Sequence, residues 1–573
     1  MIGAAQRALP GQAQRSPVAQ RRPSGAPRSV RTRYKAKKHG DGAAGADEAA
    51  KPSGGADSAE AAQPVFDLLA AIKKGPGATS TMRPSSVPLG PRMRILEIPN
   101  LRDKLEPRTN PFCDPNGTRA NFDTGFVTDD DYVVAQALNR ISSDHQSVVN
   151  VPDVHKLGAS STLPVPASAV GATPLASSML SMDDDGSVSQ LYLQRAGARR
   201  TIYFNPETTT AAIVTCGGLC PGLNDVVMGL VRKLEDYGVP EGNILGLRYG
   251  FRGFYDNERK PIVLTTRHVE GIQTRGGTVL GTSRGGAKIE EMVKKISLWG
   301  INQLYVIGGN GGNAGALAIH EECVRQGVVC SVVGIPKSID NDILMIDKTF
   351  GFDTAVEEAQ KALMAANVEA TSAHRGVGLV KLMGRQSGFI AMQASLASGV
   401  VDACLIPEVP FHLDGEAGLL AYLEKVIKRK GHAVVCVAEG AGQDMLTADG
   451  AIEGTDASGN PILKDIGLYL KKRLTKELPD ATVKYIDPTY MIRAIPTTAN
   501  DRIYCTLLAM NAVHAAFAGY TGITIGLCNT HYALLPTGTV ISAARTVNPQ
   551  GKMWNRLRHS TGQPEFDGPP LSN

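Results

Sequence analysis

The chain of 573 residues has no long hydrophobic run, little excess charge and no regular pattern of cysteines. No apolar stretch approaches the roughly 18 uncharged residues that a membrane-spanning helix needs, which excludes a membrane bundle. The 60 Lys and Arg residues and 55 Asp and Glu residues leave a net charge of +5, too small an excess for a protein that binds the nucleic-acid backbone. Nine irregularly spaced cysteines predict free thiols in a reducing compartment rather than a disulfide scaffold. A hydrophobic content of 42% is instead typical of a globular protein with large cores.

The first 40 residues contain many Arg residues but no Asp or Glu. They are rich in Ala, Ser, Pro and Gln and lack the apolar core of a secretory signal, so residues 1–40 are predicted to be an organelle transit peptide. A disordered basic tail is the alternative. Residues 41–195 begin with a stretch of Ala, Gly, Asp and Ser that cannot bury enough apolar surface to fold, and we expect a partly disordered N-terminal extension there.

From about residue 208 onward, short apolar segments alternate with amphipathic segments of helical periodicity. Buried strands are expected at 211–215, 304–307 and 331–335, each followed by a loop. This alternation predicts an α/β fold with parallel-rich sheets covered by helices on both faces. Because so many strands would strain one twisted sheet, we expect two doubly wound lobes that meet near residue 353.

The final segment is expected to return to the first sheet, so the first lobe comprises residues 196–352 and 494–550. The second lobe comprises residues 353–493, and residues 551–573 are expected to be a C-terminal tail. In open α/β sheets, ligands bind beyond the carboxyl ends of strands, where helix N-termini direct N–H groups at anions. We therefore look for the functional residues in the loops that follow the strands.

Two glycine-rich loops follow expected strands, at 217–222 and 308–312. A glycine loop between a strand and a helix lets backbone amides reach phosphate oxygens without an intervening Cβ, although a sharp turn alone also explains such a loop. The first loop lacks the Gly-Lys-Ser/Thr ending of a Walker loop. The second loop matches G-x-G-x-x-A through Ala314, but the next strand, 331–335, does not end on the acidic residue that a dinucleotide site requires.

Asp340 and Asp342 flank Asn341 on the loop that follows the strand at 331–335. Two carboxylates in such a place can have different roles, because one can accept a proton while the other helps to hold a cation. A turn in which Asp and Asn side chains bond to their own backbone is the alternative. Five basic residues also lie next to glycine-rich or strand-end segments, as expected of cations that surround phosphate groups, although each alone would be a solvated surface charge. These are Arg284, Lys337, Arg385, Lys484 and Arg493.

Five motifs occur in one order along the chain. They are GGLCPGLN at 217–224, GTSRGG at 281–286, PKSIDND at 336–342, MGR at 383–385 and PTYMIR at 488–493. Together they resemble the 6-phosphofructokinases, and among them the plant-type enzymes that use ATP. The resemblance implies two similar lobes with the active site in the cleft between them, and an oligomer. It also implies transfer of the ATP γ-phosphoryl group to the 1-hydroxyl of fructose 6-phosphate, with Mg²⁺ as cofactor and fructose 1,6-bisphosphate as product.

The resemblance gives roles to individual positions, with a nucleotide site in the first lobe and a sugar-phosphate site in the second. Asp340 matches the catalytic base, which accepts the proton of the sugar hydroxyl, and Asp342 is the second catalytic carboxylate. The nucleotide positions are Gly218, Arg284, Gly285, Gly308, Gly309, Asn310, Gly311 and Gly312. The sugar-phosphate positions are Ser338, Ile339, Asp340, Met383, Gly384, Arg385, Glu439, Lys484, Tyr490 and Arg493.

The second glycine loop departs from the family pattern. Where the family reads Gly-Gly-Asp-Gly-Thr, this chain reads Gly-Gly-Asn-Gly-Gly at 308–312. The family's Asp holds Mg²⁺, so the resemblance makes Asn310 the metal ligand, but its side chain offers an oxygen without the full negative charge, and we expect weaker metal binding. Gly311 agrees with the members that use ATP, whereas members that use pyrophosphate tend to carry Asp there.

The sequence therefore favours an active, plastid-targeted ATP-dependent phosphofructokinase that is slowed by Asn310. The expected location is the plastid stroma, with the cytoplasm as the alternative. Fructose 6-phosphate and ATP are the expected ligands, a homo-oligomer such as a tetramer is the expected assembly, and neither nucleic acid nor a membrane is an expected partner. Two other functions stay open, a catalytically weakened regulatory subunit and a pyrophosphate-dependent phosphofructokinase.

Cys216 and Cys220 flank the first glycines of the loop at 217–222. A light-linked redox switch is conceivable for such thiols in a plastid. Small buried hydrophobic side chains are the more frequent role of cysteines in this setting, and we expect that role here.

Overall fold

The computed structural model describes residues 92–113, 125–135, 189–256, 258–447, 454 and 462–566. They belong to one compact unit, Pro88–Asn573, while the other unit, Met1–Val87, lies outside the described residues. The predicted transit peptide at 1–40 therefore also lies outside them. Within the described part of the chain, no helix is long and apolar enough to cross a membrane.

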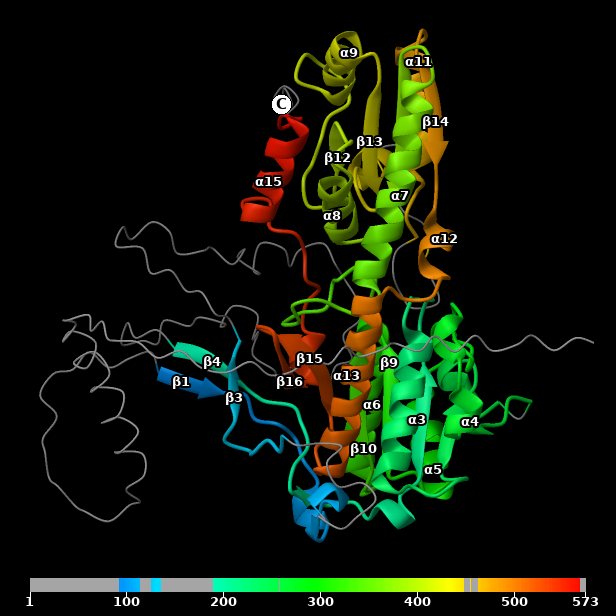
Figure 1. Cartoon of the computed structure of the whole chain (residues 1–573), viewed down its shortest axis with the longest axis vertical. Coiled ribbons are helices and arrows are strands. Elements are labelled where there is room, and N and C mark those ends of the chain that lie inside the picture. The colour runs from blue at the N-terminus through cyan, green and yellow to red at the C-terminus, as the bar shows by residue number, and fades with distance from the viewer. Residues whose placement is uncertain are drawn as a thin grey trace, which may run out of the picture. The chain divides into compact units, whose positions relative to one another are not determined.

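The first lobe is built on a seven-stranded sheet (Figure 1). Its strands are β6 (Ala211–Thr215), β7 (Ile244–Leu247), β8 (Ile262–Val263), β9 (Gln303–Gly308), β10 (Ser331–Pro336), β15 (Ile523–Cys528) and β16 (His531–Pro536). Their order is β16-β15-β10-β9-β6-β7-β8, and only the edge strands β8 and β16 are antiparallel to their neighbours. Strands β6, β9 and β10 are buried along their whole length, as their continuous apolar runs predict for strands covered on both faces.

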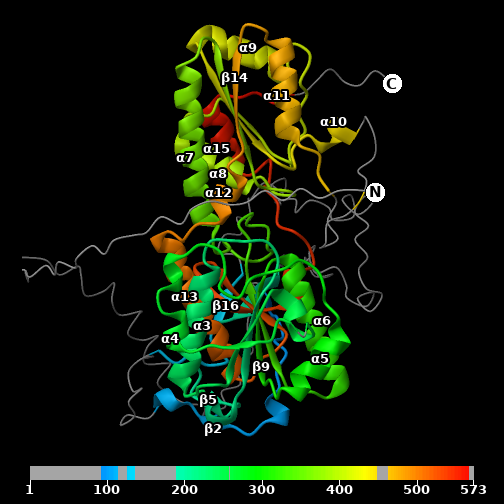
Figure 2. The same cartoon turned by 90° about the vertical axis from the view of Figure 1, so that its right-hand side faces the viewer.

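Helices cover both faces of this first sheet. They are α3 (Leu223–Tyr237), α5 (Ile289–Leu298), α6 (Asn310–Gln326) and α13 (Ala499–Phe517). Successive residues of a strand point to opposite faces, so the neighbours Ile213 and Val214 of β6 belong to different hydrophobic clusters. Ile213 packs with α3 and α13, whereas Val214 packs with α5 and α6. Figure 2 shows these two pairs of helices on opposite sides of the sheet.

The second lobe contains a four-stranded, entirely parallel sheet. Its strands are β11 (Gly376–Leu382), β12 (Ala403–Leu405), β13 (Ala433–Ala438) and β14 (Thr482–Ile486), in the order β12-β13-β11-β14. Its helices are α7 (Phe352–Thr371), α8 (Phe389–Ser398), α9 (Leu419–Lys430) and α11 (Ile466–Glu477). Helices α7 and α8 cover one face and α9 and α11 cover the other. The two lobes confirm the predicted α/β fold with parallel-rich sheets.

Helix α7 joins the two lobes. In its first turn, Thr354 donates hydrogen bonds from its N–H and its hydroxyl to the Asp501 carboxylate of α13, at 2.8 and 2.6 Å. The rest of α7 packs on β11, β13 and β14 of the second sheet. One continuous hydrophobic cluster contains Leu223 of α3, Phe352 of α7 and Leu382 of β11, so the lobes share a core.

The C-terminal part of the chain crosses back to the second lobe after β16. Helix α15 (Lys552–Thr561) packs against α8, and its apolar side chains Trp554 and Leu557 are buried. The segment expected as a tail, 551–573, is therefore packed structure up to Phe566, which is also buried. The apolar face of α15 docks on a surface far away in the sequence, which composition alone does not reveal.

Part of the N-terminal extension is ordered and packs on the first lobe. Its strands are β1 (Arg92–Ile95), β3 (Tyr132–Val134) and β4 (Ser189–Gln194), which form a small sheet, and β2 (Arg108–Thr109), which pairs with β5 (Thr201–Ile202). Leu96 and Leu193 are buried against Ile343 and Ile346 of the first lobe. The described part of the extension therefore supports the segment that directly follows the predicted catalytic carboxylates.

Asp129 fixes the extension to the first lobe. Its carboxylate accepts hydrogen bonds from Arg102 Nη1 at 2.5 Å, Arg199 Nε at 3.2 Å and the Tyr520 hydroxyl at 2.6 Å. Burial raises the pKa of Asp129, but the hydrogen bonds from Arg102 and Tyr520 outweigh burial and hold the pKa well below its ordinary value. Asp129 is therefore a charged anchor in a segment that composition predicts to be partly disordered.

Short helices lie in the connections between these elements. They are α4 (Thr266–Val269), α10 (Gln443–Thr447), α12 (Thr489–Arg493), α14 (Thr537–Val540), and the 3-10 helices η1 (Arg102–Lys104), η2 (Pro111–Cys113), η5 (Pro206–Thr208), η6 (Gly250–Phe254) and η7 (Ile272–Thr274). Helix α12 matters most for the site, because it carries the predicted residues Tyr490 and Arg493.

Candidate active site

Three neighbouring strands of the first sheet end at the same edge and open onto the predicted loops. Strand β9 lies between β6 and β10, and its register pairs Ile307 with Thr215 and Gly308 with Pro336. The three loops that follow these strands are therefore neighbours. Ligands bind at this edge in open parallel sheets.

The two glycine loops differ in the space around their glycines. A Cβ on Gly308 would lie 2.8 Å from the Cα of Gly312, a distance at which backbone would have to move. A Cβ on Gly218 would lie 3.6 Å from Arg284 Nη2 and 4.0 Å from Arg493 Nη1. Only glycine fits at 308 without a shift, and two arginines from separate elements converge on Gly218.

Two further contacts bring the three loops into one group. A Cβ on Gly217 would lie 3.5 Å from Lys337 Nζ, and a Cβ on Gly312 would lie 3.5 Å from the Cβ of Cys216. Gly217 and Cys216 belong to the first loop, whereas Gly312 and Lys337 belong to the second and third. Gly311 faces open space, since a Cβ there would have no atom within 4 Å.

The segment that carries Arg284 is hydrogen-bonded to the first glycine loop. The Gly217 N–H donates to the Ser283 carbonyl at 3.0 Å, and Thr282 Oγ1 donates to the Gly217 carbonyl at 2.8 Å. Gly285 has a φ of 64°, a left-handed conformation that favours glycine. The predicted nucleotide positions Arg284 and Gly285 therefore lie beside the first loop.

Helix α6 begins within the second glycine loop. Gly309 is its N-cap residue, and Asn310, Gly311 and Gly312 form its first turn. The N–H groups of a first turn have no partner within the helix, and together with the helix dipole they attract phosphate groups. The loop thus offers an uncharged anion site made of backbone.

Asn313 stabilises this loop and is not among the predicted site residues. Its Nδ2 donates to the carbonyls of Gly308 and Gly309 at 3.1 Å each, and its Oδ1 accepts from Thr524 Oγ1 at 3.3 Å. The side chain is completely buried. The signal for Asn313 in the sequence is a polar side chain within an expected helix. Its partner Thr524 on β15 is too distant in the chain to be recognised from local pattern.

Ser338 organises the two carboxylates of the third loop. Its hydroxyl donates to Asp342 Oδ1 at 2.5 Å and accepts from the Asp340 N–H at 3.2 Å. Asp342 Oδ2 accepts from Asn310 Nδ2 at 3.0 Å. Two side chains therefore donate hydrogen bonds to the Asp342 carboxylate. In the alternative, a local turn, this carboxylate would accept hydrogen bonds from its own backbone instead.

The backbone around Asp340 is fixed from both lobes. Asn341 has a φ of 56°, which Asn tolerates better than most residues, and its Oδ1 accepts from the Thr349 N–H at 3.0 Å. The Thr349 hydroxyl bonds to the Ser338 carbonyl. From the second lobe, Ser387 Oγ donates to the Asp340 carbonyl at 2.9 Å.

The Asp340 carboxyl group has an unusual environment. Its Oδ1 is buried and has no hydrogen-bond partner. Burial, followed by the carboxylates of Asp342 and Glu439, raises its pKa to about 8, while Lys337 and Arg385 oppose the rise. A carboxyl group that exchanges its proton near neutral pH is suited to act as a general base.

The second lobe contributes the loop 383–388, which follows β11. Met383 is buried, and Gly384 has a φ of 131°, where a Cβ would lie 2.3 Å from the Ser387 carbonyl oxygen. The Gly384 carbonyl accepts a hydrogen bond from the Gly440 N–H at 3.0 Å, which ties this loop to the loop after β13. Glycine is therefore required at 384, and the two loops hold each other in place.

Arg385 and Glu439 face each other from these two loops. Arg385 Nε lies 3.9 Å from Glu439 Oε1. Burial raises the pKa of Glu439, and the positive charges of Arg385, Lys381 and Arg493 oppose the rise. Because Glu439 is close enough to Asp340 to raise its pKa, this pair belongs to the same group of charges.

Helix α12 adds Tyr490 and Arg493 to the group. The Arg493 guanidinium lies 4.8 Å from the centre of the Tyr490 ring, and Tyr490 is 75% exposed. Arg493 is also near Gly218 and Glu439, so it links the two lobes. The Tyr490 ring is therefore open to solvent beside the Arg493 guanidinium.

Two predicted sugar-phosphate residues are placed differently. Lys484 lies in the middle of the edge strand β14, where it pairs with Gly378 of β11, and its Nζ lies 3.6 Å from Glu369 Oε2 near the end of α7. The structure does not bring Lys484 to the Asp340 group within the chain. The Ile339 side chain is buried in the hydrophobic core, which leaves only its backbone for a ligand contact.

Comparisons with known proteins identify the family of this chain. The family model for phosphofructokinase matches residues 210–516. The chain belongs to the phosphofructokinase family. It is 54% identical over 399 residues to ATP-dependent 6-phosphofructokinase 5, chloroplastic, of Arabidopsis thaliana, covering 69% of this chain and 73% of that protein. It is 44% identical over 394 residues to the ATP-dependent 6-phosphofructokinase of Borreliella burgdorferi, covering 67% of this chain and 87% of that protein.

A solved structure shares the phosphofructokinase fold. The crystal structure of the pyrophosphate-dependent phosphofructokinase from Marinobacter aquaeolei matches with a TM-score of 0.52 at 18% identity. The match covers 64% of this chain and 94% of that one. At this identity the likeness supports the fold alone.

Asn310 and Asp342 of this phosphofructokinase are suited to hold Mg²⁺. Asn310 donates its Nδ2 to Asp342, so its Oδ1 is left buried and without a hydrogen-bond partner. Hard divalent cations prefer oxygen ligands, and Mg²⁺ often takes only one or two carboxylates and completes its shell with phosphates and water. Among the described residues, no group of three or more His, Cys, Asp or Glu side chains is placed to hold a metal ion.

The cysteines of this phosphofructokinase are free thiols, which confirms the prediction from their spacing. Cys216 and Cys220 are buried. Burial raises the pKa of Cys216 to about 12 and also raises that of Cys220, although Lys337 opposes both shifts. A protonated, buried thiol is a poor nucleophile, which supports the role of a small hydrophobic side chain.

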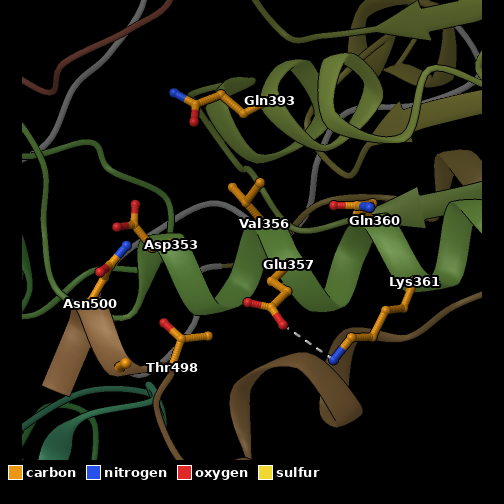
Figure 3. A pocket seen from close by; sticks show the side chains of 9 residues that line it. Asp353, Val356, Glu357, Gln360, Lys361, Gln393, Thr498 and Asn500 are labelled. Atoms are coloured by element: carbon orange, nitrogen blue, oxygen red, sulfur yellow. Dashed lines mark ion pairs between the residues drawn. The ribbon is translucent and has the colours of Figure 1, made fainter.

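A groove of 670 Å³ runs beside α7. Its lining includes Glu357, Gln360 and Lys361 of α7, Gln393 of α8 and Asn500 of α13 (Figure 3). Glu357 and Lys361 form an ion pair at 3.6 Å on its wall. None of the predicted site residues lines this groove, so it is separate from the Asp340 group.

Proposed function

We propose that this protein transfers the γ-phosphoryl group of ATP to the 1-hydroxyl of fructose 6-phosphate and forms fructose 1,6-bisphosphate. The environment of Asp340 carries the proposal, because its free, buried oxygen and raised pKa suit a base that serves a sugar hydroxyl. The relatives at 54% and 44% identity are named ATP-dependent 6-phosphofructokinases, which supports the same reaction.

In this reaction Asp340 accepts the hydroxyl proton while the hydroxyl oxygen attacks the γ-phosphorus. The new P–O bond forms as the bond to the leaving ADP breaks. Arg284, Arg385 and Arg493 offset the charge of the phosphate groups, and the N–H groups at the start of α6 bind the nucleotide phosphates. Phosphoryl transfer depends mostly on such positioning and charge compensation.

Mg²⁺ belongs to the proposal as a cofactor. When bound, it supplies neutralisation of the phosphate charge. Asp342 and Asn310 would hold it, and Ser338 keeps the Asp342 carboxylate in place through its hydroxyl. Since the amide of Asn310 carries no net charge, we expect this site to bind Mg²⁺ more weakly than one with Asp at 310.

A donor assay tests the proposed function. Purified protein is incubated with fructose 6-phosphate, Mg²⁺ and either ATP or pyrophosphate, and fructose 1,6-bisphosphate is measured. We expect product with ATP and none with pyrophosphate. Product with pyrophosphate alone would instead identify a pyrophosphate-dependent enzyme.

The Asn310→Asp variant serves as the matched comparison in this assay. We expect it to reach half of its maximal rate at a lower Mg²⁺ concentration than the natural chain, because a carboxylate replaces an amide in the metal site. An inactive natural chain beside a strongly active Asn310→Asp variant would contradict the proposal and favour a regulatory subunit.

We further propose a plastid location and a homo-oligomer. The composition of residues 1–40 and the chloroplastic relative support the location. A fluorescent protein fused behind residues 1–40 should accumulate in plastids, and fluorescence confined to the cytosol would contradict this. Light scattering of the purified protein tests the assembly, for which we expect a mass of several chains, with a tetramer as the first candidate.

A further inference from the structure

The segment between α14 and α15 crosses from the first lobe to the second (Figure 1). On the way it contacts the loop that carries Asp340. Ala544 forms an antiparallel bridge with Ile343, and the Arg545 N–H donates to the Asp342 carbonyl at 2.8 Å. The crossing segment is therefore attached directly beside the predicted catalytic carboxylates.

The Arg545 side chain extends this attachment to both lobes. Its Nη1 donates to the carbonyls of Ile346 at 2.9 Å and Asp347 at 2.8 Å. Its guanidinium carbon lies 4.9 Å from the centre of the Phe389 ring, and Phe389 is the first residue of α8 in the second lobe. One side chain thus contacts the continuation of the carboxylate loop and the start of a helix in the other lobe.

Arginine is the residue type that this place requires. Burial lowers the pKa of Arg545 and the carboxylate of Asp347 opposes the shift, but a guanidinium stays charged at physiological pH. Its Nη1 donates to two carbonyls while the face of its planar guanidinium lies over an aromatic ring. A lysine ammonium is a point charge that can retain part of the hydrogen bonding but not the stacking.

A second link lies two residues further along the crossing segment. The Val547 N–H donates to Glu408 Oε1 at 2.7 Å, and the Gly388 N–H donates to both Glu408 carboxylate oxygens at 3.0 Å. Gly388 ends the loop 383–388. The crossing segment is therefore bonded to the carboxylate loop at one point and, through Glu408, to the predicted sugar-phosphate loop at the next.

We propose that Arg545 is a positioning residue that holds the carboxylate loop, residues 338–347, in register with the sugar-phosphate loop of the second lobe. It touches the loop through backbone carbonyls and acts on Asp340 through them. In-line phosphoryl transfer is sensitive to displacements of the base by about 1 Å, so a loosened loop slows the reaction. This inference rests on the proposed phosphoryl transfer and adds a residue that none of the recognised motifs contains.

Kinetics of Arg545→Met and Arg545→Lys test the proposal, with Arg556→Met on the exposed side of α15 as the matched control. We expect Arg545→Met to lower kcat by about 10- to 100-fold and to raise KM for fructose 6-phosphate more than KM for ATP. Arg545→Lys should recover part of the loss, and Arg556→Met should match the natural chain. A kcat of Arg545→Met equal to that of Arg556→Met would overturn the proposal.

A double variant separates positioning from a general loss of stability. If Arg545 acts through the base, Arg545→Met should reduce the residual activity of an Asp340→Asn enzyme much less than it reduces the activity of the natural chain. The same fractional loss in both backgrounds would overturn the proposal, because a purely structural defect acts regardless of the base.

Hydrogen exchange provides a measurement that does not depend on turnover. In Arg545→Met, the amides of residues 338–347 should exchange faster, while those of α9 on the other face of the second sheet should not change. If Arg545→Met does not fold, Phe389→Leu removes the stacking and keeps both carbonyl bonds, and it should give the same pattern at smaller size. Absence of turnover in the natural chain would refute the proposed reaction alone, whereas unchanged exchange at 338–347 would overturn the role of Arg545.

Discussion

The two lobes meet around Asp340 but offer anions different chemistry. The first lobe presents backbone beside a few basic side chains such as Arg284, and a Cβ on Gly308 would lie 2.8 Å from the Cα of Gly312. The second lobe presents charged side chains, with Arg385 Nε 3.9 Å from Glu439 Oε1. The comparison teaches that the nucleotide side depends more on shape, since Gly308 tolerates no added atom, whereas the sugar-phosphate side depends more on charge. Substitutions in the two lobes should therefore affect different substrates.

Asp340 lies between the two kinds of site, and replacing it should have the largest effect. We expect Asp340→Asn to lower kcat by about 10²- to 10⁴-fold, because it removes the general base. KM for both substrates should change little, since a base acts mainly in the transition state. Steady-state kinetics measure this, with the unfolding temperature as the check on folding. A kcat near that of the natural chain would show that another group takes the proton.

Arg385→Leu tests the charge-dependent side. Losing one charged hydrogen-bonding group costs about 1.5 to 3 kcal/mol, which corresponds to a rise of about 10- to 100-fold in KM for fructose 6-phosphate. KM for ATP should stay close to that of the natural chain. Lys428→Leu on the exposed part of α9 removes the same charge far from the site and should leave both values unchanged. Equal increases in the two KM values would break the comparison.

Gly308→Ala tests the shape-dependent side with one added methyl group. The forced shift of the backbone costs about 1 to 2 kcal/mol, so KM for ATP should rise by about tenfold while KM for fructose 6-phosphate stays near its natural value. Gly538→Ala in α14 is the matched control, because a Cβ there would meet no atom closer than 3.8 Å and Gly538 is not a nucleotide position. Should both glycine variants bind ATP equally well, steric fit would not govern the nucleotide side.

The smallest effect is expected in the extension, which touches neither substrate. The folded-state pKa of Asp129 lies below its unfolded value near 4, so its contribution to stability is present above pH 4 and is lost as the pH falls further. The Asp129 side chain is 47% exposed, and screening limits the contribution to about 1 kcal/mol. Asp129→Asn should lower the unfolding temperature at pH 7, with a smaller difference at pH 3 and unchanged KM values. A constant difference at both pH values would contradict the charged anchor.

Much of the fold is predictable because its signals are local. A continuous apolar run such as 211–215 indicates a strand buried on both faces, and the glycines at 217–222 and 308–312 mark the loops that follow. The pair of carboxylates around Asn341 is local as well. These features lie within a few residues of each other, so composition and spacing are enough to find them.

The remaining features depend on partners that are distant in the sequence. Asn313 is held by a threonine on β15, and Arg545 binds carbonyls of the carboxylate loop, which precedes it by most of the second lobe. Lys484 resembles Arg493 as a basic residue near a strand end, but the register of β14 places it in mid-strand. The register of β14 and the long-range contacts of Asn313 and Arg545 arise only in the assembled fold, so the local sequence pattern does not predict them.

The core that both lobes share limits how far the lobes can move apart. Phe350 and Phe352 lie in one cluster with Leu382, so a clamshell opening would expose apolar surface at a cost of about 25 cal/mol for each Å². Uncovering about 200 Å² would thus cost about 5 kcal/mol, which is comparable to the whole stability of many domains. The shared core therefore disfavours a wide hinge, and we expect substrates and products to pass with smaller tilts about α7 and rotations of exposed side chains such as Tyr490.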